Sequence, residues 1–121
     1  DVPINPPFEL DNRGKCSLAL DLRQAAARAV AAQLVARADV VVTNLRAQAL
    51  ARVGLDYPSL HARNPRLVYC HLTGYGIDGP DRDRPAYDVG AYWGRAGVAL
   101  ALTPKGGEPP QQRGGMGDHT T

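Results

Sequence analysis

The sequence predicts an α/β fold with an open, mostly parallel sheet and flanking helices. Residues 16–22 alternate apolar with polar or small side chains, which is typical of a strand. Residues 24–38 are rich in alanine and place Val30 and Leu34 on one face at helical spacing. Residues 39–44 follow as a β-branched run, typical of a buried parallel strand. A strand, a helix and a strand in this order make a βαβ unit, for which a right-handed crossover is expected.

The elements after this unit are predicted from periodicity and from the positions of glycine and proline. Gly54 follows an apolar helical segment at the position that glycine prefers after a helix. Asn64 and Pro65 end the next helical segment, and Gly74 closes a third strand. The expected order is helix 47–53, helix 57–63, strand 66–73, loop 74–86, helix 87–102 and loop 103–115.

Composition limits the class of protein. The chain has 121 residues, 44% hydrophobic and 21% charged, which is ordinary for a globular domain that buries a core of its own. The net charge of +2 is dispersed along the chain, which argues against nucleic-acid binding. No apolar run reaches the roughly 18 residues of a membrane span, and the first residues lack the pattern of a signal peptide. We therefore expect a cytoplasmic protein with no membrane partner.

Cysteines and histidines give no sign of a metal or disulfide framework. Cys16 and Cys70 have no CxxC spacing, and each lies in a predicted strand, where a buried and reduced thiol is expected. The three histidines, His61, His71 and His119, have no ligand-like spacing, so no metal site is predicted. The GxxxxGK[ST] and GxSxG patterns are also missing.

Both ends of the sequence differ from those of a complete domain. A Pro-rich segment, expected to be extended, opens the chain at Pro3, Pro6 and Pro7. The last residue comes three positions after Asp118, inside a predicted helix. We expect residues 1–121 to be part of a larger domain that is truncated at both ends.

A glycine hinge near the C-terminus holds one carboxylate. Gly114, Gly115 and Gly117 precede Asp118, and glycine permits positive φ angles and close approach of a ligand to the backbone. Asp118 either caps a following helix or acts as a nucleophile or general base. Asn44 and residues 73–76 are expected at the carboxyl edge of the sheet, where ligands bind in open α/β folds.

Six segments, taken in order, resemble one known family. They are residues 12–22 (NRGKxSxxLDL in the family), 38–46 (ADVxxENFRPG), 50–69 (LxRLGLxYxxLxxxNPRLVY), 74–80 (GFGxxGP), 85–88 (PxYD) and 117–118 (GD). Together they cover the chain from about residue 8 to residue 121. The chain therefore resembles the family III CoA-transferases.

This resemblance implies part of a Rossmann-like large domain from an interlocked homodimer. It implies transfer of coenzyme A between carboxylic acids, with Asp118 as the nucleophile that forms mixed anhydrides and an aspartyl-CoA thioester. Coenzyme A is thus expected as the carrier, in the form of acyl-CoA, and a carboxylic acid as the second substrate. The isolated chain is expected to bind CoA weakly at best.

Five further residues take their roles from the resemblance. Leu20 and Arg23 correspond to residues that hold the adenosine end of CoA, Asn44 and Leu45 to a pair along the CoA path, and Arg52 to a phosphate or adenine contact. The family often has Phe at the Leu45 position. For Arg23 and Arg52 the alternative is an ordinary solvated arginine.

Tyr87 separates two branches of the family. The α-methylacyl-CoA racemases resemble this chain but have His at this position, as the acid–base partner of the hinge Asp. The ordinary tyrosine pKa near 10 suits that role poorly, so transfer is favoured. Tyr87 either bonds near the acyl carbonyl or packs on the sheet, and Trp93 is either core or the wall of an acyl pocket. A CoA-binding or dimer-forming module without catalytic activity remains the alternative from another class.

Overall fold

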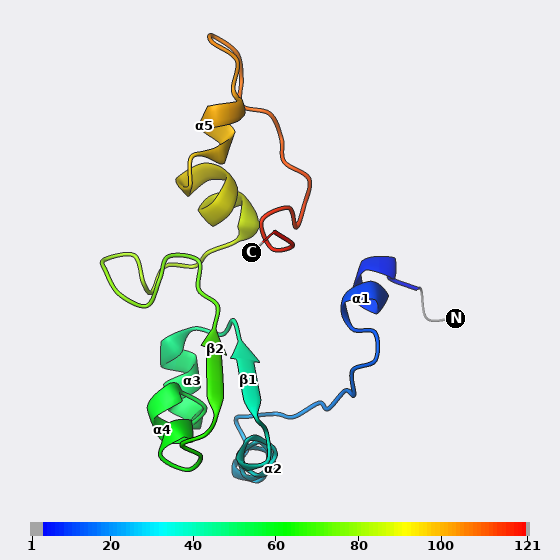
Figure 1. Cartoon of the computed structure of the whole chain (residues 1–121), viewed down its shortest axis with the longest axis vertical. Coiled ribbons are helices and arrows are strands. Elements are labelled where there is room, and N and C mark those ends of the chain that lie inside the picture. The colour runs from blue at the N-terminus through cyan, green and yellow to red at the C-terminus, as the bar shows by residue number, and fades with distance from the viewer. Residues whose placement is uncertain (1–3, 121) are drawn as a thin grey trace.

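The computed structural model describes residues 4–120 and contains a small parallel sheet with helices (Figure 1). β1 and β2 pair in parallel, with Val40 opposite Val68 and Thr43 opposite His71. The elements in chain order are α1 (Pro6–Asp11), α2 (Ala25–Ala36), β1 (Val40–Thr43), α3 (Ala47–Val53), α4 (Tyr57–His61), β2 (Val68–His71), the π-helix η1 (Val89–Arg95) and α5 (Val98–Leu102). The predicted α/β class is confirmed.

Local sequence explains where several helices begin and end. α3 ends at Gly54, which adopts φ 71°, a left-handed conformation that glycine takes without steric cost. α1 begins after Asn5, whose side-chain oxygen accepts a hydrogen bond from the Phe8 N–H at 3.3 Å, and prolines occupy its first turn. The expectation of an extended N-terminal entry is therefore wrong for Pro6 and Pro7, while Pro3 lies outside the described residues.

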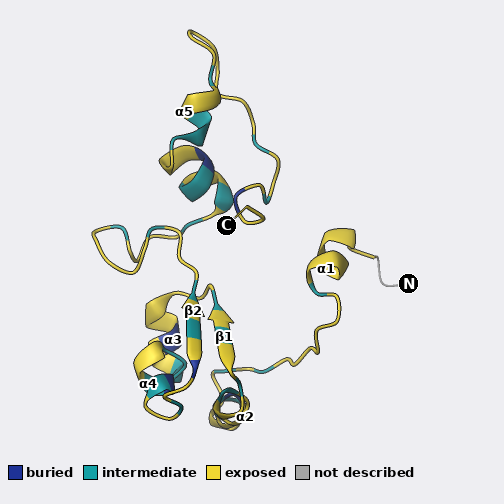
Figure 2. Cartoon of the chain, in the orientation of Figure 1, coloured by how far each residue is buried: buried dark blue, intermediate teal, exposed yellow. Residues whose placement is uncertain are grey.

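One face of the sheet is covered and the other is bare. Tyr69 is half-buried, and its hydroxyl donates a hydrogen bond to Leu55 O at 3.0 Å while its ring lies 5.8 Å from Tyr57 of α4. On the opposite face Val42 is 65% and Val68 59% exposed. The expected burial of strand 39–44 on both faces is wrong (Figure 2).

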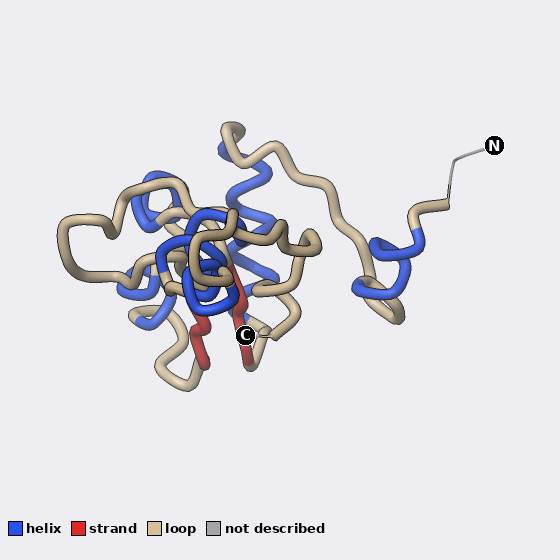
Figure 3. The backbone as a smooth tube through the Cα atoms, turned by 90° about the horizontal axis from the view of Figure 1, so that it is seen from above, coloured by secondary structure: helices blue, strands red, loops and turns tan. Residues whose placement is uncertain are grey.

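The described residues contain a smaller core than expected. Its buried apolar side chains are Ala31, Leu50, Leu60, Leu67 and Trp93. The chain exposes 9976 Å², whereas a compact monomer of 12.9 kDa exposes about 6,300 Å². The expectation that these residues bury a full core of their own is wrong, because the bare sheet face and α1, which lies apart from the sheet, remain open (Figure 3).

Three further local predictions fail. Residues 16–22 form no strand and pair with none in the described part of the chain, so alternation alone did not make a strand there. Cys16 and Cys70 are exposed free thiols and are not buried. The single helix expected over 87–102 is broken at Gly97, whose φ of 81° ends η1 and precedes α5. No helix in residues 4–120 is long and apolar enough to span a membrane.

Candidate active site

The glycine hinge is joined to the PxYD segment by one carboxylate. The Gly117 N–H donates a hydrogen bond to Asp88 Oδ1 at 2.8 Å, and Gln112 Nε2 donates to Asp88 Oδ2 at 2.8 Å. Tyr87 precedes Asp88 in the chain and Asp118 follows Gly117. The Asp88 side chain therefore joins the two segments that carry the predicted catalytic residues, although these residues are far apart in sequence.

Gly117 is buried because Asp88 and Tyr92 pack directly against its Cα. A Cβ at this position would collide with Asp88 Oδ1 and with the Cβ and Cγ atoms of Tyr92. Glycine is thus required for close packing and for the N–H bond to Asp88 at the same time. Close approach at this hinge was expected for a ligand, whereas at Gly117 it is the Asp88 and Tyr92 side chains that lie against the backbone.

Asp118 is exposed on a series of turns and caps no helix in residues 114–120. The N–H groups of His119 and Thr120 donate to the carbonyls of Gly115 and Gly117 at 3.0 and 3.2 Å. Both predicted roles of Asp118, as a helix cap and as a nucleophile or general base, stay predictions. The Gly117 N–H donates its hydrogen bond to Asp88. It is therefore not available to donate one to the oxyanion of a tetrahedral intermediate.

The loop after β2 reaches Tyr87 and closes on itself. A Cβ on Gly74 would overlap the Ala86 side chain, so the two ends of loop 74–86 touch. Along the loop, Arg95 of η1 donates a hydrogen bond to Asp81 at 2.6 Å. Hydrogen bonds from Arg84 and then Arg95 hold the pKa of the Asp81 carboxyl below its ordinary value. The carboxyl end of β2 is thereby connected to the Tyr87–Asp88 segment.

Tyr87, which precedes η1, and Trp93, which lies within it, have opposite environments. Tyr87 is 82% exposed, so the alternative that it packs on the sheet is wrong. Trp93 is 8% exposed, and its indole N–H donates to Pro110 O at 3.1 Å. Trp93 thus belongs to the core and ties loop 103–115 to η1.

Leu20 and Arg23 lie in the segment before α2, with Arg23 in a turn that leads into this helix. The Arg23 guanidinium donates two hydrogen bonds to Asp21, at 2.8 and 3.0 Å, and this carboxylate raises the pKa of Arg23 while Arg23 lowers that of Asp21. Arg28 of α2 donates to the carbonyls of Leu22 and Arg23 at 3.0 and 2.7 Å. The segment that carries Leu20 and Arg23 is therefore fastened to the start of α2.

Asn44 and Leu45 follow directly after β1, at the predicted carboxyl edge of the sheet. His71, the last residue of β2, has Nε2 at 2.7 Å from Leu45 O. Because a carbonyl only accepts, the Nε2 atom of His71 carries the proton in this contact. No local sequence pattern predicts this contact, because the two residues are 26 positions apart in the chain.

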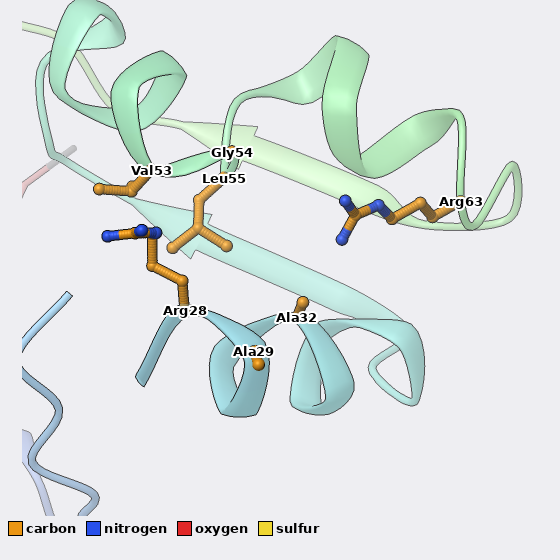
Figure 4. Close-up of a pocket in the computed structure, with 7 residues that line it drawn as sticks. All are labelled: Arg28, Ala29, Ala32, Val53, Gly54, Leu55 and Arg63. Carbon is orange, nitrogen blue, oxygen red and sulfur yellow. The ribbon is translucent and has the colours of Figure 1, made fainter. Parts of the chain in front are cut away.

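A cavity of 240 Å³ lies between α2, α3 and α4 (Figure 4). Arg28 and Arg63 are its two charged lining residues, and Val53, the neighbour of Arg52, lines the α3 side. Arg28, which also donates a hydrogen bond to the Arg23 carbonyl, thus lines the same cavity as Val53. Residues 4–120 contain no group of three or more His, Cys, Asp or Glu that could hold a metal ion.

Comparison with known proteins identifies the family. The model of CoA-transferase family III matches residues 2–121, so the chain belongs to this family. It is 39% identical over 115 residues to the cinnamoyl-CoA:phenyllactate CoA-transferase of Clostridium sporogenes, covering 95% of this chain and 28% of that protein. It is 36% identical over 115 residues to the (R)-2-hydroxy-4-methylpentanoate CoA-transferase of Clostridioides difficile, covering 95% and 29%.

Solved structures agree with this result. A CAIB/BAIF family protein from Brucella suis superimposes with a TM-score of 0.75 at 39% identity, over 82% of this chain and 26% of that one. Rv3272 from Mycobacterium tuberculosis superimposes with a TM-score of 0.77 at 31% identity, over 89% and 32%. The chain thus spans less than a third of the length of these relatives.

Proposed function

We propose that the protein transfers coenzyme A from an acyl-CoA to a carboxylic acid, with Asp118 as nucleophile. The Asp118 carboxylate attacks the thioester carbonyl, a C–O bond forms, and the C–S bond breaks as CoA thiolate leaves. The resulting mixed anhydride is attacked by the thiolate at the aspartyl carbonyl, which releases the donor acid and leaves an aspartyl-CoA thioester. The acceptor carboxylate then repeats both steps in reverse.

Chemical principles support this sequence. A thiolate is a good leaving group because the thiol pKa is near 8.5. A mixed anhydride is open to hydrolysis, so the site must exclude water at this stage. In this chain Asp118 is exposed, so a further part of the protein is proposed to cover the site during the reaction.

The observation that carries the proposal is the placement of Asp118. Its carboxylate follows a glycine that is fixed by Asp88, next to the segment of the exposed Tyr87. Tyr87 is proposed to donate a hydrogen bond near the acyl carbonyl, and the absence of His at this position argues against acid–base racemisation. The relatives named above carry CoA-transferase names, which favours transfer.

The CoA site is proposed to run from the segment before α2, past the end of β1, to α3. Leu20 and Arg23 contact the adenosine end, Asn44 and Leu45 line the path toward Asp118, and Arg52 contacts a phosphate or the adenine. Arg28 and Arg63, which line the 240 Å³ cavity, are proposed to add positive charge to this site. A cytoplasmic homodimer is proposed as the form of the whole protein.

The test uses the full-length protein, incubated with a panel of acyl-CoAs and then hydroxylamine. The panel includes cinnamoyl-CoA, acetyl-CoA and succinyl-CoA, because relatives are named for such substrates. We expect a hydroxamate on the peptide that contains Asp118, detected by mass spectrometry, and none in Asp118→Asn. If no donor gives this adduct, the nucleophile assignment fails, and deuterium exchange at the acyl α-carbon then tests the isomerase alternative.

A further inference from the structure

Asp88 accepts hydrogen bonds on both of its carboxylate oxygens, although no step of the proposed reaction involves this residue. Both of its carboxylate oxygens are engaged at 2.8 Å, one by the Gly117 N–H and the other by the side-chain amide of Gln112. The three residues come from three separate segments, namely the approach to η1, the end of loop 103–115 and the hinge. A single half-buried carboxylate thus joins these segments.

The contact to Gly117 concerns the peptide group adjacent to Asp118. A hydrogen bond from a backbone N–H to an ionised carboxylate is shorter and stronger than one between neutral groups. Because Gly117 is held by Asp88 on one side and by Tyr92 packing on the other, its position is determined by side chains of η1 and its approach. The position of Asp118, one residue later, follows from it.

Gln112 orients the Asp88 carboxylate, to which its side-chain amide is hydrogen-bonded. Its Nε2 donates to Asp88 Oδ2, while its Oε1 is buried and has no partner among the described residues. This geometry has a consequence for substitution. If Asp88 is replaced by Asn, a flip of the Gln112 amide turns the free Oε1 toward the new N–H donor, and the Asn oxygen still accepts from Gly117.

We propose that Asp88 is the positioning residue of the nucleophile, holding the Gly117–Asp118 peptide in place while Gln112 orients it. Asp88 acts through Gly117 and does not touch the reacting atoms. This inference rests on the proposed role of Asp118 for its kinetic consequence, but the hinge contact itself is independent of that role. Misplacement of a reacting group by about 1 Å costs a factor on the order of 100 in rate.

The experiment compares Asp88→Ala, Asp88→Asn and Asp83→Ala in the full-length protein. Asp83 is a matched control, an exposed carboxylate in the same region whose recorded partner is its neighbour Arg82 at 3.5 Å. In Asp88→Ala we expect kcat to fall about 100-fold with the KM for acyl-CoA within about twofold, because positioning and not binding is lost. Asp88→Asn keeps kcat within about tenfold of the wild type, since it retains the acceptor but loses the charge.

Hydrogen–deuterium exchange at the Gly117 N–H, resolved by mass spectrometry, is the second readout. Exchange is expected to accelerate at least about tenfold in Asp88→Ala, where the acceptor is missing, and to be unchanged in Asp83→Ala. Unchanged exchange and unchanged kcat in Asp88→Ala overturn the inference, as does an equal loss in Asp88→Asn with intact folding. If the wild type forms no Asp118 adduct, the proposed function fails instead, and Gly117 exchange alone decides whether Asp88 holds the hinge.

Discussion

Residues 25–71 and residues 74–120 are held together by different forces. The first region packs α2, α3 and α4 against one face of β1 and β2, and it contains Leu50, Leu60 and Leu67 as buried apolar side chains. In the second region Trp93 is the buried hydrophobic side chain, and segments are joined by Asp81, Asp88 and close glycine contacts. Apolar burial stabilises the scaffold, whereas directional hydrogen bonds set the geometry of the hinge that carries Asp118.

The difference matters for function because the two kinds of contact fail differently. Burial is non-directional and scales with area, so the loss of one side chain weakens the whole region. A hydrogen bond to a backbone N–H fixes the position of one peptide group. Its loss therefore changes the position of that group more than it changes the free energy of unfolding. Substitutions in the first region should therefore act on stability, and those in the second on the Asp118 geometry.

The largest expected effect on stability is that of Leu60→Ala. Leu60 is 1% exposed, and removing a fully buried leucine side chain costs about 2–5 kcal/mol in free energy of unfolding. Urea titration of the full-length protein measures the change. Leu100→Ala is the control, because Leu100 is 80% exposed and its loss is expected to cost no more than about 0.5 kcal/mol. Equal losses in the free energy of unfolding for the two variants would contradict the conclusion that the buried side chain of Leu60 stabilises the protein.

Gly117→Ala tests the hinge by steric means. The new methyl group collides with Asp88 and Tyr92, and overpacking of this kind costs about 1–3 kcal/mol. We expect a lower thermal midpoint and a loss of the hydroxamate on Asp118 in the same variant. Gly114→Ala is the matched control, since a Cβ on Gly114 meets no atom within 4 Å. The close packing is refuted if both variants behave like the wild type.

Trp93→Phe removes one hydrogen bond and keeps an aromatic ring. Loss of the N–H bond to Pro110 O is expected to cost about 1 kcal/mol and to loosen loop 103–115. Limited trypsin digestion should then cut faster after Lys105, with the site identified by mass spectrometry. Tyr57→Phe serves as control, because no hydrogen bond of the Tyr57 hydroxyl is recorded within the described residues. Equal cleavage rates in the two variants would contradict the role of Trp93.

The smallest effect is the pH dependence of the Asp81 contacts. Arg84 and Arg95 lower the pKa of Asp81 below 3.8, so the folded state binds this proton less tightly than the unfolded state. The stabilisation is complete above the unfolded pKa and is lost as pH falls through the lowered folded pKa. The difference in thermal midpoint between wild type and Asp81→Asn should therefore shrink as pH is lowered from 7 to about 3. A difference that is independent of pH would argue against this cause.

Local patterns predicted those elements that a few adjacent residues determine. The helix that ends at Gly54 was predicted with its observed bounds, because the glycine takes the left-handed conformation that ends helices. The strands at residues 40–43 and 68–71 lie inside the predicted runs. The strand over 16–22 failed because alternation states only which side chains share a face, and a strand also needs a partner.

The sequence by itself determined the α/β class, the family membership through ordered motifs, and the glycine hinge that precedes Asp118. Only the tertiary structure decided that the hinge is held by Asp88 and Gln112, which lie 29 and 5 residues before Gly117 along the chain. It also decided that one sheet face stays bare and that His71 holds Leu45. The physical reason is that periodicity and turn chemistry act over a few residues, whereas a hydrogen bond between distant segments depends on how the whole chain is packed.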